Sequence, residues 1–184
     1  MFTKPNTILY VRRNNLFITG KHVPPANLSI SNDLLTNMEF IDRENFIATC
    51  ANFFSSHGME GKKVLVVLDQ GIIFKKTISL DNSDKDIIQT AVDKFVESIP
   101  FESGQRAFEQ LETNNQLELY ATNSDLFQAV AEALEQSKVR KIIAVTPSYA
   151  YKLSKDTKPT ESIAQFLNNR EVRKVADFLT SAPL

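Results

Sequence analysis

The stretch that decides the fold is AVDKFVESIPFE, residues 91–102. Apolar residues recur at helical spacing from Ile87 to Ile99 and predict an amphipathic helix. Pro100 cannot continue that helix and favours extended geometry at Ile99, so the helix is expected to end there. Phe101 follows the helix end, where glycine is more usual. Two alternatives stay open for this aromatic side chain: it packs into the core, or it is exposed as an anchor for a partner.

Strand patterns flank this helix on both sides, and a second helix follows them. The segment Gln116–Thr122 alternates between apolar and polar residues, which is typical of a half-buried strand. The expected elements are strand, helix, strand, strand, helix and strand, over Ile72–Leu80, Lys85–Ile99, Arg106–Glu112, Gln116–Thr122, Asp125–Ser137 and Val139–Thr146. This order is that of a ferredoxin-like βαββαβ unit.

The rest of the chain predicts further elements on either side of that unit. They are a hairpin of Thr7–Arg13 and Leu16–Thr19, an irregular stretch Lys21–Asp42 with one short strand near Leu28–Ile30, a helix that is capped by Asp42 and ends near Gly58, the strand Lys63–Asp69, and two helical phases within Thr160–Thr180. Gln70 and Gly71 predict a turn, after which Ile72–Leu80 is expected to run back antiparallel to Lys63–Asp69. The fold class is therefore α+β with mixed sheets.

The composition excludes several classes of protein. The 184 residues include 21 basic and 22 acidic side chains, so the charge gives no sign of nucleic-acid binding. The longest apolar runs, Val64–Leu68 and Ile142–Val145, are too short to span a bilayer, and residues 1–15 do not resemble a signal peptide. We therefore expect a cytoplasmic protein without membrane insertion in this chain. A single cysteine, Cys50, lies on an apolar helical stripe and is expected to be a buried hydrophobe.

The sequence contains no recognisable catalytic or cofactor motif. The five glycines do not have the spacing of a phosphate-binding loop. The two histidines, His22 and His57, have no partner residues in a known catalytic arrangement. Asp81, Asp84 and Asp86 precede a helix without the central glycine and terminal glutamate of a calcium loop. We expect no enzyme activity, no cofactor and no metal.

Four segments in order resemble the PilM family of type IV pilus assembly proteins, which are actin-like proteins related to FtsA and to the cytoplasmic domain of GspL. The segments are KKVLVVLDQGIIFKKTISL, KFVESIPFE, RAFEQLETNNQLELYAT and SDLFQAVAEALEQSKVRKIIAVTPS. The similarity extends from about Thr7 to Lys152, and its most specific part is the signature Ile-Pro-Phe-Glu at residues 99–102.

This resemblance implies a partial actin-like first domain with an inserted subdomain. Residues 1–70 would form the first part of the actin-like subdomain, residues 71–148 the ferredoxin-like insertion, and residues 149–184 helices that return to the first part. An actin-like ATPase has a glycine- and aspartate-rich phosphate turn in its first hairpin, and here Arg12–Asn15 occupies that position. The second half of an actin fold is not expected in this chain, which speaks against ATP binding.

The function that the resemblance implies is a non-catalytic scaffold at the inner face of the cytoplasmic membrane. It would bind a short peptide of a PilN-like inner-membrane protein in a groove beside the inserted subdomain, with Ile99, Pro100, Phe101 and Phe108 as candidate contacts. A GspL-like cytoplasmic domain of a type II secretion system is one alternative, and a fragment of an actin-like ATPase is another. A homodimer is also compatible with the sequence. A continuation beyond residue 184 into about 20 apolar residues would favour a membrane-anchored scaffold, and a second phosphate loop would favour the ATPase.

Overall fold

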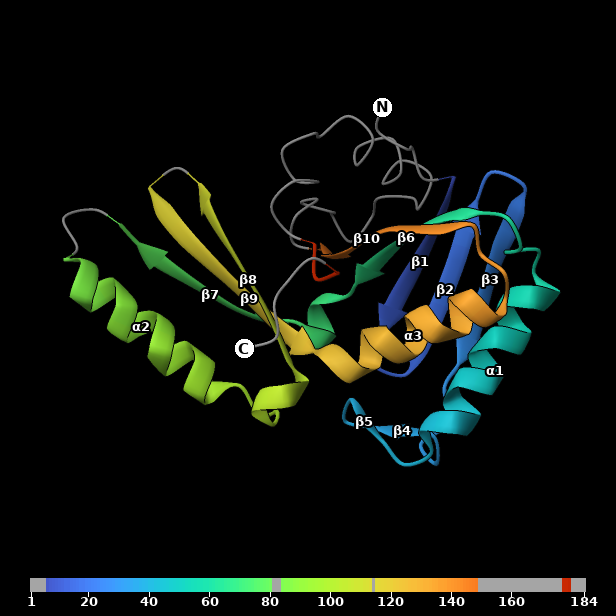
Figure 1. The fold of residues 1–184 in the computed structure, drawn as a ribbon, viewed down its shortest axis with the longest axis horizontal. Helices are drawn as coiled ribbons and strands as arrows, with labels where there is room; N and C mark the ends of the chain where they lie inside the picture. The colour runs from blue at the N-terminus through green and yellow to red at the C-terminus, as the bar shows by residue number, and fades with distance from the viewer. Residues whose placement is uncertain (1–5, 81–83, 114, 149–176, 180–184) are drawn as a thin grey trace.

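The computed structural model describes residues 6–80, 84–113, 115–148 and 177–179 (Figure 1). Most helices and strands lie close to the segments that the sequence predicts. In chain order the elements are β1 (Thr7–Arg12), β2 (Asn15–Gly20), β3 (Val23–Ser29), β4 (Leu35–Thr36), β5 (Glu39–Phe40), α1 (Arg43–Ser56), β6 (Lys63–Leu68), the 3-10 helix η1 (Gln70–Ile72), β7 (Phe74–Ser79), α2 (Lys85–Ser98), the 3-10 helix η2 (Ser103–Gln105), β8 (Arg106–Thr113), β9 (Gln116–Asn123), α3 (Ser124–Gln136) and β10 (Lys141–Pro147).

The larger sheet has five strands in the order β10-β6-β1-β2-β3. Three of these strands, β10, β6 and β1, are parallel to one another. Strands β1, β2 and β3 form an antiparallel meander. The expected hairpin is confirmed, with Arg12 opposite Asn15. The expectation of an irregular stretch after Lys21 is wrong for β3, which runs through Pro24 and Pro25. Prolines are tolerated there because β3 is an edge strand and makes ladder hydrogen bonds on one side only.

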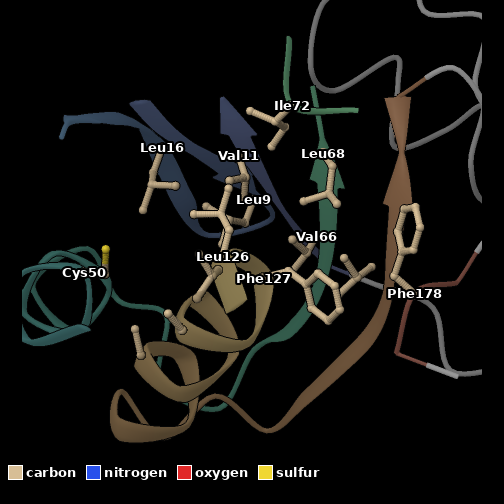
Figure 2. Close-up of a cluster of buried hydrophobic side chains, with 14 of the residues drawn as sticks. Leu9, Val11, Leu16, Cys50, Val66, Leu68, Ile72, Leu126, Phe127 and Phe178 are labelled. Carbon is tan, nitrogen blue, oxygen red and sulfur yellow. The ribbon is translucent and has the colours of Figure 1, made fainter. Parts of the chain in front are cut away.

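Helices α1 and α3 pack together against one face of this sheet (Figure 1). Asp42 caps α1, as predicted, because its side chain accepts a hydrogen bond from the backbone N–H of Asn45 at 3.1 Å. Figure 2 shows Leu126 and Phe127 of α3 directed at the buried side chains of the sheet strands. This interface is the main hydrophobic core of the molecule.

The smaller sheet has three antiparallel strands in the order β7-β9-β8, and α2 lies along one face of it (Figure 1). The ring of Phe95 on α2 contacts the ring of Phe108 on β8, with centroids 6.3 Å apart. Lys76 on β7 donates a hydrogen bond from Nζ to the carbonyl oxygen of Ala91 on α2 at 3.2 Å. These contacts join the middle and the C-terminal half of the helix to the sheet.

Two expected strand pairings are wrong. Residues Phe74–Ser79 do not run back along β6: the 3-10 helix η1, capped by Asp69, redirects the chain into the smaller sheet. The final strand of the expected βαββαβ unit, β10, pairs in parallel with β6. The smaller sheet, which lies between β6 and β10 in the sequence and is called the inserted sheet below, therefore has three strands. A parallel neighbour requires a crossover connection, which includes α3, and the buried run Ala144–Ser148 is typical of a strand in a parallel sheet that is covered on both faces. The fold class α+β with mixed sheets is confirmed. The partial actin-like domain and the division at residues 70 and 148 stay predictions.

Residues Asp177 and Phe178 lie against the outer edge of β10. The N–H of Phe178 donates to the carbonyl oxygen of Val145 at 2.8 Å, and the N–H of Val145 donates to Oδ1 of Asp177 at 2.9 Å. The Phe178 ring stacks on Phe127, with centroids 6.2 Å apart (Figure 2). Most of the helical region expected over Thr160–Thr180 lies outside the described residues. Within the described part of the chain, no helix is long and apolar enough to cross a bilayer.

Candidate functional site

The proline signature ends α2 as the sequence predicts. The helix stops at Ser98, and Ile99 has the extended backbone angles φ −71° and ψ 123°. The N–H of Ile99 still donates to the carbonyl oxygen of Val96, at 3.2 Å. Ile99 is buried and Pro100 is exposed, so the signature turns one apolar residue inward and leaves the next at the surface.

Phe101 is a buried residue with 6% of its surface exposed. Its ring meets that of Phe74 on β7, and its carbonyl oxygen accepts a hydrogen bond from Nε of Arg106 at 2.6 Å. Of the two alternatives that the sequence left open, this burial favours the core position. Phe108 is half-buried against Phe95 under α2. A role of these residues in partner binding stays a prediction.

A cleft with a volume of about 390 Å³ lies where the α2–β8 connection approaches the beginnings of α1 and α3. Three segments that are distant in sequence line it. They contribute Glu39, Phe40 and Arg43 from β5 and α1, Pro100, Phe101, Glu102 and Gln105 from the α2–β8 connection, and Asn123 and Asp125 from the start of α3. Of the four predicted contact residues, the structure therefore brings Pro100 and Phe101 to this cleft, and Ile99 and Phe108 do not line it.

Hydrogen bonds fix the wall that α3 contributes. Asn123 caps α3: its Oδ1 accepts from the N–H of Asp125 at 2.9 Å. Its Nδ2 donates to the carbonyl oxygen of Met38 at 2.9 Å, which ties the cap to the β4–β5 turn. Gln105 donates from Nε2 to Oδ2 of Asp125, also at 2.9 Å. These bonds hold all three segments of the cleft in place before any partner arrives.

An ion pair joins α1 to α3 beside the cleft. Arg43 donates from Nη1 and Nη2 to the two carboxylate oxygens of Glu132, at 3.0 and 2.5 Å. This bidentate hydrogen bonding raises the pKa of Arg43 and lowers the pKa of Glu132. The guanidinium carbon of Arg43 also lies 6.0 Å from the centroid of the Phe40 ring. Arg43 is thus already engaged by groups of the protein itself.

The charge that remains in the cleft is negative. Glu39 and Glu102 are exposed, and neither has an ion-pair or hydrogen-bond partner for its carboxylate among the described residues. Asp125 adds a third carboxylate, shared with Gln105. Because Arg43 is neutralised by Glu132, the cleft favours a group that carries positive charge.

Sequence reasoning missed the contributions of β5, α1 and α3 to this site. Asn123 has a residue type that is typical of an N-cap and lies directly before a helix. Glu39, Arg43 and Gln105 carry no local signal, because their proximity depends on how the two sheets are joined. Only the tertiary arrangement could have revealed them.

The hairpin at the expected phosphate-turn position holds Arg12 and Asn15 opposite each other. Arg12, Arg13 and Asn14 are exposed. In the described residues, no group of three His, Cys, Asp or Glu side chains is placed to hold a metal ion.

No protein-family model matches the chain, and no curated protein matches it. Several solved structures resemble the chain, and three of them are described in turn. The cytoplasmic domain of EpsL, an inner-membrane component of the type II secretion system of Vibrio cholerae, gives a TM-score of 0.51 at 7% sequence identity, with 82% of this chain and 60% of that one covered. A PilM–PilN type IV pilus biogenesis complex gives 0.48 at 16% identity, with 75% and 46% covered.

The third structure is a Bacteroides thetaiotaomicron protein with an actin-like ATPase fold and unknown function. It gives a TM-score of 0.40 at 10% identity, with 76% of this chain and 51% of that one covered. The structural neighbours are thus the kinds of protein to which the sequence resemblance pointed. The chain spans between 46% and 60% of the length of these structures. The likeness to the EpsL domain concerns the fold.

Proposed function

We propose that this protein is a non-catalytic scaffold of a type IV pilus assembly platform, located in the cytoplasm at the inner face of the membrane. Its cleft binds a short segment of an inner-membrane partner that resembles PilN. The observation that carries this proposal is the cleft of about 390 Å³ at the Ile-Pro-Phe-Glu signature, built from three segments of the chain. That volume lies near the lower end of the range of about 300–1,000 Å³ found for ligand pockets.

The lining of the cleft suits a peptide. Exposed Pro100 and half-buried Phe40 offer apolar contact area, and Gln105 offers amide groups that can bond to a peptide backbone. The hydrogen bonds of Asn123 fix the geometry before binding, so a partner segment would order few protein side chains when it docks. A small, rigid and partly polar cleft of this kind favours a short extended segment.

The unpaired carboxylates indicate the charge of that segment. Glu39 and Glu102 would attract a peptide with at least one lysine, arginine or free amino terminus. Such residues are enriched on the cytoplasmic side of membrane-spanning helices. The electrostatics of the cleft therefore fit the cytoplasmic end of an inner-membrane protein.

The described residues that line the cleft support binding rather than catalysis. They include no histidine and no nucleophilic Ser, Thr, Cys or Lys side chain. Cys50, the single thiol, lies buried in the core between α1 and the sheet. A nucleophile and an adjacent base, which covalent catalysis requires, do not meet there.

A GspL-like cytoplasmic domain of a type II secretion system is the second candidate function. The TM-score of 0.51 to the EpsL cytoplasmic domain favours it. Under this alternative the same cleft would serve a component of a secretion system in place of a pilus protein. The fragment of an actin-like ATPase finds no support in the exposed Arg12–Asn14 turn.

Co-purification separates the two candidates. The protein is co-expressed with a full-length PilN-like membrane protein, extracted in mild detergent and passed over an affinity column through a tag on the partner. Stoichiometric recovery of the chain supports the pilus proposal. Recovery with the corresponding type II secretion component alone would transfer the function to the second candidate, and recovery with neither would refute both.

A further inference from the structure

Two isoleucines are the most exposed large apolar residues in the described part of the chain. Ile41 has 66% of its surface exposed and Ile87 has 64%. Ile41 follows β5, and Ile87 lies in the first turn of α2. The start of α2 lies at the far end of the inserted sheet from the β4–β5 hairpin, so the two sites belong to different ends of the molecule (Figure 1).

Ile87 lines a groove between α2 and the edge strand β7. The groove has a volume of about 360 Å³ and is lined by Lys76, Asp86, Ile87, Thr90, Ala91 and Lys94. We call it the Ile87 groove. Its surface is mainly apolar, and its charged lining residues are two lysines and one aspartate. Lys94 has no ion-pair partner among the described residues, and Lys76 donates to a backbone carbonyl instead of a carboxylate.

Ile41 belongs to a segment that hydrogen bonds hold in place. The charge of this segment is negative, opposite to that of the lysines in the Ile87 groove. Its N–H donates to the carbonyl oxygen of Leu34 at 3.0 Å, and the next residue, Asp42, is held as the cap of α1. Glu39 and Glu44 flank the isoleucine, and both are exposed without an ion-pair partner among the described residues. We call residues 39–44 the Ile41 corner.

We propose that the Ile41 corner of one copy of this chain docks into the Ile87 groove of the next copy. An aliphatic side chain that protrudes between two glutamates complements an apolar groove that is bordered by two lysines. Ile41 would pack against Ile87 and Ala91, while Glu39 and Glu44 approach Lys76 and Lys94. The inference goes beyond partner binding in the cleft, because its occupant is a second copy of this protein. Glu39 lines the cleft as well as the Ile41 corner, so the two contacts would compete for it.

This contact joins two different surfaces, so it is heterologous. Each copy keeps one free corner and one free groove, and association continues from copy to copy as a ring or an open chain. A two-fold homodimer would instead bury the same surface on both copies. Two isoleucines and a few exposed ion pairs form a small interface, so the association is weak and decreases with salt concentration.

Sedimentation velocity tests the proposal with two variants. Ile41→Asp replaces the apolar side chain of the Ile41 corner by a carboxylate, and Ile87→Asp does the same in the Ile87 groove. Both side chains are exposed, so neither change disturbs the core. Asn52→Asp, which adds the same charge at an exposed position of α1, is the matched control. We expect wild type and Asn52→Asp to form oligomers as the concentration rises, and each isoleucine variant alone to associate at least 10-fold more weakly.

A mixture of the two variants identifies the geometry. Each variant keeps one intact surface, so an equimolar mixture forms a one-to-one dimer and nothing larger. Several results would overturn the proposal: a wild-type protein that stays monomeric at millimolar concentration, single variants that associate like wild type, or a mixture that stays monomeric while wild type associates. A wild-type dimer that does not grow further would indicate a two-fold interface and would equally contradict it.

Discussion

The ring of Phe101 stands edge-on to the ring of Phe74, with centroids 5.6 Å apart and ring planes at 80°. This geometry is a favourable arrangement for two aromatic rings. It fixes the α2–β8 connection against β7, at the point where the chain enters the inserted sheet. The Phe101 side chain therefore supports the fold, while the residues on either side of it line the cleft.

Phe101→Ala should consequently destabilise the protein. Removal of a buried phenylalanine side chain costs about 3–5 kcal/mol of unfolding free energy. Phe95→Ala, which empties a buried site on α2, provides the comparison and should cost a similar amount. Urea unfolding of both variants measures the difference. A loss below about 1 kcal/mol for Phe101→Ala, with a normal loss for Phe95→Ala, would show that Phe101 is not a core residue.

Cys50 should react slowly as a thiol in the native protein. Burial raises its pKa to about 12, so the reactive thiolate is scarce at neutral pH. Cys50→Ser should lower the unfolding free energy by on the order of 1 kcal/mol, because a hydroxyl replaces a buried thiol. Labelling with a thiol reagent with and without urea checks the burial. Equal labelling rates in the two conditions would contradict it.

The pair Arg43–Glu132 should contribute little to stability, and its contribution should disappear in acid. The two side chains are 38% and 46% exposed, and such pairs couple by about 0–1 kcal/mol. Arg43 lowers the pKa of Glu132, so the stabilisation is present above the unfolded pKa of glutamate and is lost as the pH falls through the lower folded value.

A double-mutant cycle with Arg43→Gln and Glu132→Gln measures this coupling. We expect a small favourable value at neutral pH that decreases towards zero in strong acid. A coupling of several kcal/mol, or one that is unchanged after Glu132 has been protonated, would contradict the exposed geometry.

ATP with magnesium should not bind to this chain. The position of the phosphate turn holds exposed Arg12, Arg13 and Asn14 in place of the glycines and the acidic residue of an actin-like site. Isothermal titration calorimetry should give no saturable heat. A micromolar binding isotherm would revive the interpretation of the chain as a fragment of an actin-like ATPase.

Local sequence signals were sufficient for most of the fold. Pro100 determines where α2 ends, and Asp42 determines where α1 begins, because each acts on the backbone of its immediate neighbours. The sheet assignment of β10 could not be predicted in the same way. Its apolar run suits either sheet, and the choice depends on its pairing with β6, which lies more than 70 residues earlier in the chain.

The candidate site shows the same limit. Phe101 drew attention because an aromatic residue after a helix-stopping proline is unusual, and the resemblance to the PilM family made Pro100 and Phe101 candidate contacts. Glu39 and Asp125 lie in other segments, and their position beside Glu102 follows from how the inserted sheet joins the helices of the larger one. The negative charge of the cleft was therefore not predictable from the chain's near-zero net charge.

The most direct test of the central claim is a binding titration with a labelled peptide from the cytoplasmic N-terminus of a PilN-like protein. Fluorescence anisotropy compares wild type with Glu102→Arg, which places a bulky positive side chain in the cleft. Glu97→Arg makes the same change at an exposed position of α2 outside the cleft and is the control. We predict that Glu102→Arg weakens binding at least 10-fold and that Glu97→Arg binds like wild type. Equal affinity of all three proteins, or no binding by wild type, would contradict the claim that this cleft holds the partner segment.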